Sequence, residues 1–194
     1  MRLHRTLCLL PLTVFVLFLT SLAHADFQPG LKKPKVCGRY GGMDKWLAPA
    51  MQGHAVAQFC MGWEWETKVQ DYRVAASWYR KAAEQGHAAA QVSLGFLYEQ
   101  GKDVPQDYLQ AANWYRKSAA QGDAIAQWML GAVYEYGQSV PQNYVQAHMW
   151  YNLAAAQGQE EAVTARDKIG TEMTPEQIAE AQRLAREWLA QHQK

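Results

Sequence analysis

Residues 86–98 read GHAAAQVSLGFLY, and residues 122–134 read GDAIAQWMLGAVY. The two segments start 36 residues apart and share glycine, alanine, glutamine, leucine and tyrosine at equivalent positions. An earlier copy, GHAVAQFCMGWEW, occupies residues 53–65. A repeat of this length is typical of a solenoid, in which one small helical or strand-containing unit is stacked on the next.

The similarity continues through the second half of each copy. VPQDY at 104–108 corresponds to VPQNY at 140–144, and the pair Trp-Tyr recurs at 78–79, 114–115 and 150–151. The first copy is three residues shorter, because its Gly-x-x-Val-Pro turn is trimmed. These matches predict an array over residues 44–169, with units at about 53–85, 86–121 and 122–157 and a partial unit at 158–169.

Each unit has the periodicity of two helices. Ala75, Trp78, Tyr79 and Ala82 fall at i, i+3, i+4 and i+7, which places them along one helical face. The equivalent residues of the next two copies have the same spacing, and alternation at a period of two is absent. The predicted fold class is therefore all-α.

The helix ends are marked by residues that favour them. Asp71, Asp107 and Asn143 share one repeat position and are predicted N-caps of the second helices. Glycines that follow the helices are predicted to end them in the left-handed conformation. By contrast, Gly62, Gly95 and Gly131 lie inside the first helices, where glycine costs about 1 kcal/mol relative to alanine. Their recurrence predicts that a neighbouring helix lies where a side chain would be.

The two ends of the chain differ from the repeats. Residues 1–25 combine two early arginines, an apolar run and a final Ala-x-Ala, which predicts a secretory signal peptide cleaved after Ala25. The alternative is an uncleaved membrane anchor, although the run is short for a bilayer span. Residues 26–43 are predicted to be an extended leader. Residues 174–192 begin with the capping box TPEQ and are predicted to form a closing helix.

Charge excludes one class of partner. Without the two arginines of residues 1–25, 17 of the 19 basic residues remain against 18 acidic residues. The sequence has no block of lysine or arginine residues that would form the positively charged surface to which nucleic acids or anionic lipids bind. We expect no nucleic-acid partner and no stable membrane insertion after cleavage of the signal peptide.

Two cysteines, Cys37 and Cys60, remain in the predicted mature chain. In an oxidising compartment such a pair predicts a disulfide, and only one connectivity is available. The alternative is two unpaired thiols.

Candidate catalytic and metal-binding groups are few. His54 and His87 occupy one repeat position, whose third occupant is Asp123, so a helix-start role is favoured over a metal site. Glu66, Glu99 and Glu135 also share a position. Paired carboxylates can hydrolyse sugars at a suitable separation, but a solvated or loop-bonding role is the simpler interpretation. Neither a serine-hydrolase motif nor a phosphate-binding loop is present. We expect no catalytic residue, no metal and no cofactor.

The combined motifs Gly-x-Ala-x-Ala-Gln, Leu-Gly-x-x-Tyr and Val-Pro-Gln-Asp-Tyr resemble the Sel-one-like repeat, a relative of the tetratricopeptide repeat. The resemblance covers about residues 53–165. It implies a right-handed superhelical solenoid of antiparallel helix pairs that serves as an adaptor or scaffold. It implies no chemistry. One secreted branch of the family, linked to penicillin binding, has a disulfide in every repeat, but Ser93 and Met129 replace the cysteine in two copies here.

First-helix positions that vary between copies are the candidate partner-binding residues. In solenoids of this kind the first helices line the concave side, and large aromatic residues there are typical interface anchors. The alternative is that these side chains fill gaps between units. The five candidates are Phe59, Trp63, Val92, Phe96 and Trp128.

These features together predict a non-catalytic protein-binding scaffold of the bacterial periplasm or exterior. A cell-wall-directed binder or hydrolase, acting on peptidoglycan or β-lactams, is the leading alternative. A structural subunit of an envelope assembly is a third possibility, which predicts a large exposed apolar patch.

Overall fold

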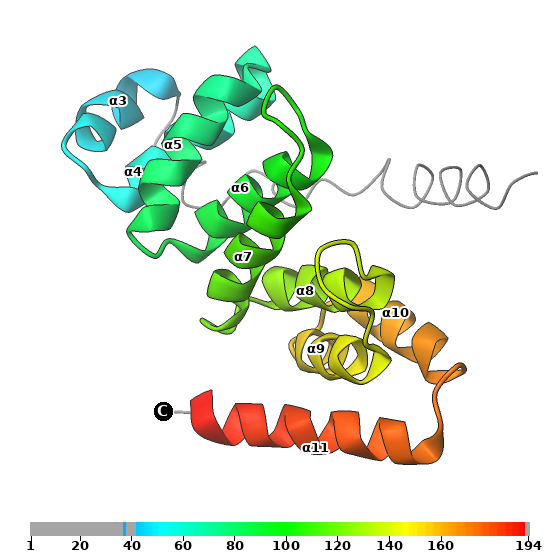
Figure 1. The fold of residues 1–194 in the computed structure, drawn as a ribbon. Helices are drawn as coiled ribbons and strands as arrows, with labels where there is room; N and C mark the ends of the chain where they lie inside the picture. Colours follow the sequence, from blue (N-terminus) through cyan, green and yellow to red (C-terminus); the bar gives the residue numbers. More distant parts are fainter. Residues whose placement is uncertain (1–36, 38–41, 193–194) are drawn as a thin grey trace, which may run out of the picture.

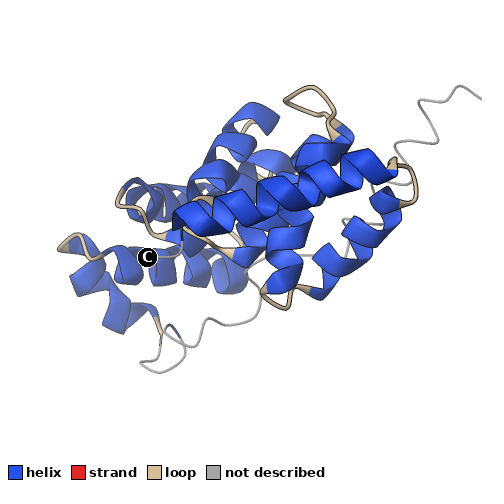
Figure 2. Ribbon diagram, turned by 90° about the horizontal axis from the view of Figure 1, so that it is seen from below, coloured by secondary structure: helices blue, strands red, loops and turns tan. Residues whose placement is uncertain are grey.

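The computed structural model describes Cys37 and residues 42–192, and this part of the chain contains helices and no strands (Figures 1 and 2). The predicted signal peptide and most of the predicted leader lie outside the described residues. The helical elements are α3 (Met43–Met51), α4 (Ala55–Glu64), the π-helix η1 (Trp65–Val69), α5 (Tyr72–Glu84), α6 (Ala88–Gln100), α7 (Tyr108–Ala119), α8 (Ala124–Tyr136), α9 (Tyr144–Ala156), α10 (Glu160–Gly170) and α11 (Pro175–His192).

Each helix from α3 to α10 packs against the next one along the chain. The first helices of successive units are α4, α6, α8 and α10, and the second helices are α5, α7 and α9. The closing helix α11 packs on α9, where it covers the last complete unit (Figure 1). The predicted all-α solenoid of helix pairs is confirmed. No helix among the described residues is both long and apolar enough to cross a membrane.

The second helices begin where their capping residues predict. Asp71 Oδ1 accepts a hydrogen bond of 3.0 Å from the Val74 backbone N–H, and Asp107 and Asn143 cap α7 and α9 in the same way. At the start of α11, Thr174 and Gln177 exchange the two reciprocal bonds of a capping box. Local sequence therefore sets these helix starts.

The turn between the paired helices differs in the first unit. Gly101 and Gly137 end α6 and α8 with φ of +64° and +66°. In the shorter first copy, α4 continues into the π-helix η1, and Gln70 takes the left-handed conformation with φ of +61°. Residues with a side chain rarely adopt this left-handed conformation, which explains why the longer copies have glycine at the end of the helix.

The glycines inside the first helices allow close contact with a tyrosine of the second helix. A Cβ atom at Gly62 would lie 2.5 Å from a ring carbon of Tyr79, and the same holds for Gly131 and Tyr151. A Cβ atom at Gly95 would lie 2.7 Å from a ring carbon of Tyr115. The predicted close approach is confirmed, and the neighbour is chiefly an aromatic ring. All three tyrosine side chains are buried in the core.

Buried glutamines tie each unit to the one before it. Gln91 Nε2 donates to the Ala83 carbonyl at 3.0 Å, and Gln91 Oε1 accepts from Gln121 Nε2 at 2.8 Å. Gln58 and Gln127 make the equivalent bonds in their own units. The recurring spacing of Ala-x-Ala-Gln thus gives each helix-end carbonyl a second hydrogen bond, beside the one it accepts from the glycine N–H three residues further on, and so joins successive units.

Candidate binding site

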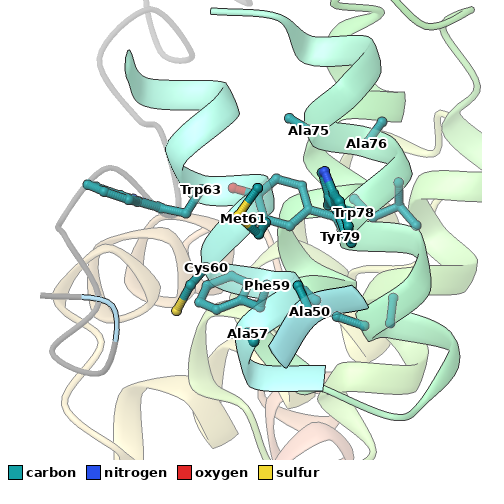
Figure 3. Packing of buried hydrophobic residues seen from close by; sticks show 14 of the residues in the cluster. Ala50, Ala57, Phe59, Cys60, Met61, Trp63, Ala75, Ala76, Trp78 and Tyr79 are labelled. Atoms are coloured by element: carbon teal, nitrogen blue, oxygen red, sulfur yellow. The ribbon is translucent and has the colours of Figure 1, made fainter. Parts of the chain in front are cut away.

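A disulfide joins the chain ahead of α3 to α4, the first helix of the first complete unit. Cys37 and Cys60 are bonded, and both are fully buried. The predicted disulfide is therefore present in the structure. Figure 3 shows Cys60 and Trp63 on the side of α4 that faces away from α5, whereas Phe59 and Met61 lie toward Tyr79.

Phe59 packs between the first two units. Its ring lies 4.7 Å from the ring of His87 in a stacked arrangement and 5.7 Å from the ring of Tyr79. Only 3% of the residue is exposed. Because His87 starts the second unit, Phe59 fills the gap that the stacking of units creates.

Trp63, Val92 and Phe96 are also buried, and each exposes at most 6% of its surface. Lys102 Nζ lies 5.8 Å from the ring centroid of Phe96. These residues present little surface of their own, which favours the packing role that the sequence left open. That a partner contacts them stays a prediction.

Trp128 differs from the other four candidates because it is only partly buried and lines a cavity. It packs against both the second and the third unit. The cavity has a volume of about 290 Å³ and lies between the end of α6 and helices α8 and α10. Its lining residues are Glu99, Trp128, Met129, Ala132, Val133, Glu135, Tyr136, Gln138, Tyr151, Glu161, Thr164, Ala165 and Lys168.

The cavity exists where one unit carries a small residue. Ala132 occupies the position that Trp63 and Phe96 occupy in the two preceding copies. Replacing a large aromatic by alanine leaves space that the surrounding helices do not close. The cavity therefore corresponds to an aromatic side chain that the third unit lacks. We call the side of the array formed by α4, α6, α8 and α10 the first-helix face.

The carboxylates at the cavity are held in place by tyrosines. Glu135 is 7% exposed, accepts a hydrogen bond of 2.6 Å from Tyr151 Oη and lies 3.5 Å from Lys168 Nζ. Burial and the negative charge of Glu135 raise the pKa of Tyr151, so its hydroxyl remains a donor. The same charge raises the pKa of Lys168, which stays protonated.

The row of glutamates is a structural feature of all three units. Glu66 accepts from Tyr79 Oη at 2.5 Å, and Glu99 accepts from Tyr115 Oη at 2.6 Å. The interpretation of this position as solvated or loop-bonding is wrong, because each carboxylate is bonded to a core tyrosine of the paired helix. The joint recurrence of the glutamate and the tyrosine was the sequence signal for this pairing.

Of the two histidines that share one repeat position, only His87 caps a helix with its side chain. His87 Nδ1 accepts a hydrogen bond of 3.2 Å from the Ala90 backbone N–H, and Asp123 caps α8 in the same way at 2.9 Å. His54 precedes α4 without a side-chain cap bond. Among the residues that the structure describes, no three histidine, cysteine or acidic side chains are grouped as metal ligands.

Stacked antiparallel helix pairs that recur along the chain define a helical repeat protein. The family model described as "Sel1 repeat" matches residues 56–87, 88–123 and 124–159. The chain belongs to the Sel1 repeat family. Proteins of this family are generally protein-interaction scaffolds.

Solved structures that are similar to the chain include two repeat proteins. One is c5321, a protective antigen of uropathogenic Escherichia coli strains with an SLR fold. It is 34% identical with a TM-score of 0.74, and the match covers 77% of this chain but only 32% of the E. coli protein. The other is a Sel1 repeat protein from Oxalobacter formigenes, which is 35% identical with a TM-score of 0.60. That match covers 65% of this chain and 97% of the Oxalobacter protein. Among curated proteins, none matches the chain.

Proposed function

We propose that this protein is a non-catalytic scaffold of the bacterial cell envelope that binds a protein partner on the first-helix face. The observation that carries the proposal is the cavity beside Trp128. It is lined mainly by apolar side chains and has Glu99, Glu135 and Lys168 around it. A hollow of this kind suits one bulky apolar side chain of a partner, held at its edges by polar contacts.

The chemistry around the cavity supports binding rather than catalysis. Glu99 and Glu135 accept hydrogen bonds from buried tyrosines, and Lys168 pairs with Glu135. A general acid or base needs a group that can exchange a proton with a substrate. These groups are instead bonded to one another or to the core, as expected for a rigid recognition surface.

The disulfide supports a location outside the cytoplasm. Disulfides persist in oxidising compartments and are rare in the cytosol. The Cys37–Cys60 bond therefore agrees with the export that residues 1–25 predict. The periplasm or the cell exterior is the proposed location.

Photocrosslinking in intact cells tests the proposal. A photoreactive phenylalanine analogue replaces Tyr136, which is 46% exposed and lines the cavity. The control carries the same analogue at Leu109 on the second helix α7, where the residue is 57% exposed. We expect a dominant protein adduct from position 136 that position 109 does not give. Identical adducts from both positions, or an adduct with cell-wall material alone, would contradict a protein-binding first-helix face.

A further inference from the structure

His148 is a buried titratable residue that the repeat pattern does not require. It lies on α9, exposes 5% of its surface, and its Nδ1 atom is buried without a hydrogen-bond partner among the described residues. The equivalent residues of the first two units are Ala76 and Ala112, which are also buried. The third unit, on which α11 packs, therefore has a titratable side chain where the other two have a small apolar one (Figure 1).

The imidazole of His148 lies where three helices meet. It lines a cavity of about 470 Å³ together with Arg166 and Asp167 of α10. From α11 the lining residues are Ile178 and Gln182, and neither is charged. Arg166 Nη2 donates to Asp167 Oδ1 at 2.7 Å, so the two charged groups that act on His148 are paired with each other.

The remaining neighbour of α9 brings no charge to this cavity. Helix α8 has one charged residue, Glu135, which lines the other cavity beside Trp128. His148 is thus enclosed by three helices and has only Asp167, already bonded to Arg166, as a nearby counter-charge.

We propose that His148 makes the attachment of the closing helix sensitive to acid, so that a proton on its imidazole releases α11 from α9. Histidine is the residue whose charge ordinarily changes between about pH 5 and pH 8. The proposal involves neither the cavity beside Trp128 nor a partner. It therefore goes beyond the scaffold function, because it gives the end of the array a conformational response.

The junction of the three helices does not suit a protonated imidazole. Both ring nitrogens of a charged histidine are donors, and Nδ1 has no acceptor among the described residues. A buried donor without an acceptor costs free energy, and so does a buried charge. Burial and the positive charge of Arg166 lower the pKa of His148, and the charge of Asp167 opposes this decrease only in part.

The closing helix is the element that responds, because it is packed less firmly than the repeats. It packs mainly on α9, and its buried residues are the small Ala181 and Ala185. Trp188 contacts Trp150 of α9 edge-on, with ring centroids 5.9 Å apart, and both rings are only partly buried. A helix with few buried apolar side chains can open without unfolding of the rest of the structure.

The direction of the pH effect follows from the two protonation equilibria. Release of α11 exposes His148 to water, where its pKa is about 6.5. The attached state binds the proton less tightly, so the attachment is strongest above about pH 6.5 and weakens as pH falls below that value. The equilibrium constant for release should rise by up to about tenfold for each pH unit, until pH reaches the lowered pKa.

Hydrogen exchange followed by mass spectrometry tests the proposal on the purified full chain. Amide protection factors, which are corrected for the intrinsic effect of pH, are measured for peptides of α11 and of α6. We expect the protection of α11 to fall at least about threefold between about pH 7.5 and about pH 5. The protection of α6 should not fall.

Two variants of His148 are the matched controls. His148→Gln keeps a polar side chain that does not titrate, and His148→Ala restores the residue of the first two units. Both should make the protection of α11 independent of pH in this range. Because the comparison is between two pH values of one protein, a variant that packs less well still gives an answer.

The two charged neighbours should act in opposite directions. Arg166→Gln removes the charge that disfavours the proton and should reduce the acid-induced fall in protection. Asp167→Asn removes the charge that favours the proton and should increase the fall. A purely structural role of these side chains would not give opposite signs.

Three results would overturn the proposal. Equal protection of α11 at both pH values in the wild type would show that acid does not release the helix. A fall that both His148 variants retain would assign the effect to another group. An equal fall in α6 would mean that acid unfolds the whole array.

Discussion

The ring of Tyr151 covers Gly131 so closely that a Cβ atom on the glycine would lie 2.5 Å from two ring carbons. The hydroxyl of the same tyrosine donates to Glu135, a residue of the cavity lining. The tyrosine thus links the packing of a helix pair to the position of a charged group on the first-helix face. The pairs Gly62–Tyr79 and Gly95–Tyr115 repeat this arrangement.

Replacement of this glycine should destabilise the protein. Gly131→Ala improves helix propensity by about 1 kcal/mol, but it forces the Tyr151 ring to move. Overpacking of this kind costs about 1–3 kcal/mol, so after the propensity gain the variant should be less stable by up to about 2 kcal/mol. We expect a lower midpoint of urea unfolding followed by circular dichroism.

The control for this change is Gly170→Ala at the end of α10, where nothing lies within 4 Å of the added methyl group. Its free energy of unfolding should equal or slightly exceed that of the wild type. Equal stability of the two variants would show that the tyrosine ring moves at no cost.

Loss of the disulfide should destabilise the array without disrupting its core. The bond closes a loop with a sequence separation of 23 residues, which the chain-entropy model values at about 3 kcal/mol. Serine is a suitable replacement at Cys60 because Ser93 stands at the equivalent position of the second unit. The double substitution Cys37→Ser and Cys60→Ser should therefore lower the free energy of unfolding by about 3 kcal/mol.

The measurement is chemical unfolding of wild type and double variant, each with and without a reductant. The reductant should lower the stability of the wild type alone. A wild type that is insensitive to reductant, or equal in stability to the variant, would contradict a stabilising role for the bond.

Glu66 should make stability depend on pH. Desolvation by burial raises the pKa of this carboxyl, and the hydrogen bond from Tyr79 and the charge of Lys102 only partly oppose the increase. The folded protein therefore binds the proton more tightly than the unfolded chain does. The contribution of Glu66 to stability is greatest at low pH and is lost as pH rises from about 4.5 through the raised pKa.

Glu66→Gln keeps the shape and an acceptor for Tyr79 but does not titrate. The free energy of unfolding of the wild type minus that of the variant should decrease between about pH 4 and pH 7. Urea unfolding of both proteins across this range provides the measurement. A difference that increases with pH would show that the charged form is favoured in the folded state.

Filling the cavity should weaken partner binding. Ala132→Phe occupies the hollow with a residue that the repeat already accepts at this position, so the fold should be retained. If an apolar anchor of the partner enters the cavity, its exclusion should lower the in-cell adduct yield from position 136 about tenfold, equivalent to about 1.4 kcal/mol. Leu109→Ala, on an exposed part of α7, should leave the yield unchanged. An unchanged yield with Ala132→Phe would place the contact outside the cavity.

The sequence by itself determined the repeat family, the helical class and the capped starts of the second helices. Asp71, Asp107 and Asn143 bond to backbone groups three residues away, so nearby residues alone specify these features. The two cysteines of the predicted mature chain allowed only one disulfide pairing.

Only the tertiary structure decided the roles of the side chains that meet across helices and units. The three glutamates that share a repeat position were predicted to be solvated or to bond a loop, but they pair with core tyrosines 13 to 16 residues away. The sequence left Phe59 open as an interface anchor or a filler between units, and in the structure it packs on His87 of the next unit, while Ala132 lines the cavity beside Trp128. Helical periodicity shows which residues share a face. Only the stacking of neighbouring units shows which of those faces are buried and where a missing side chain leaves room for another molecule.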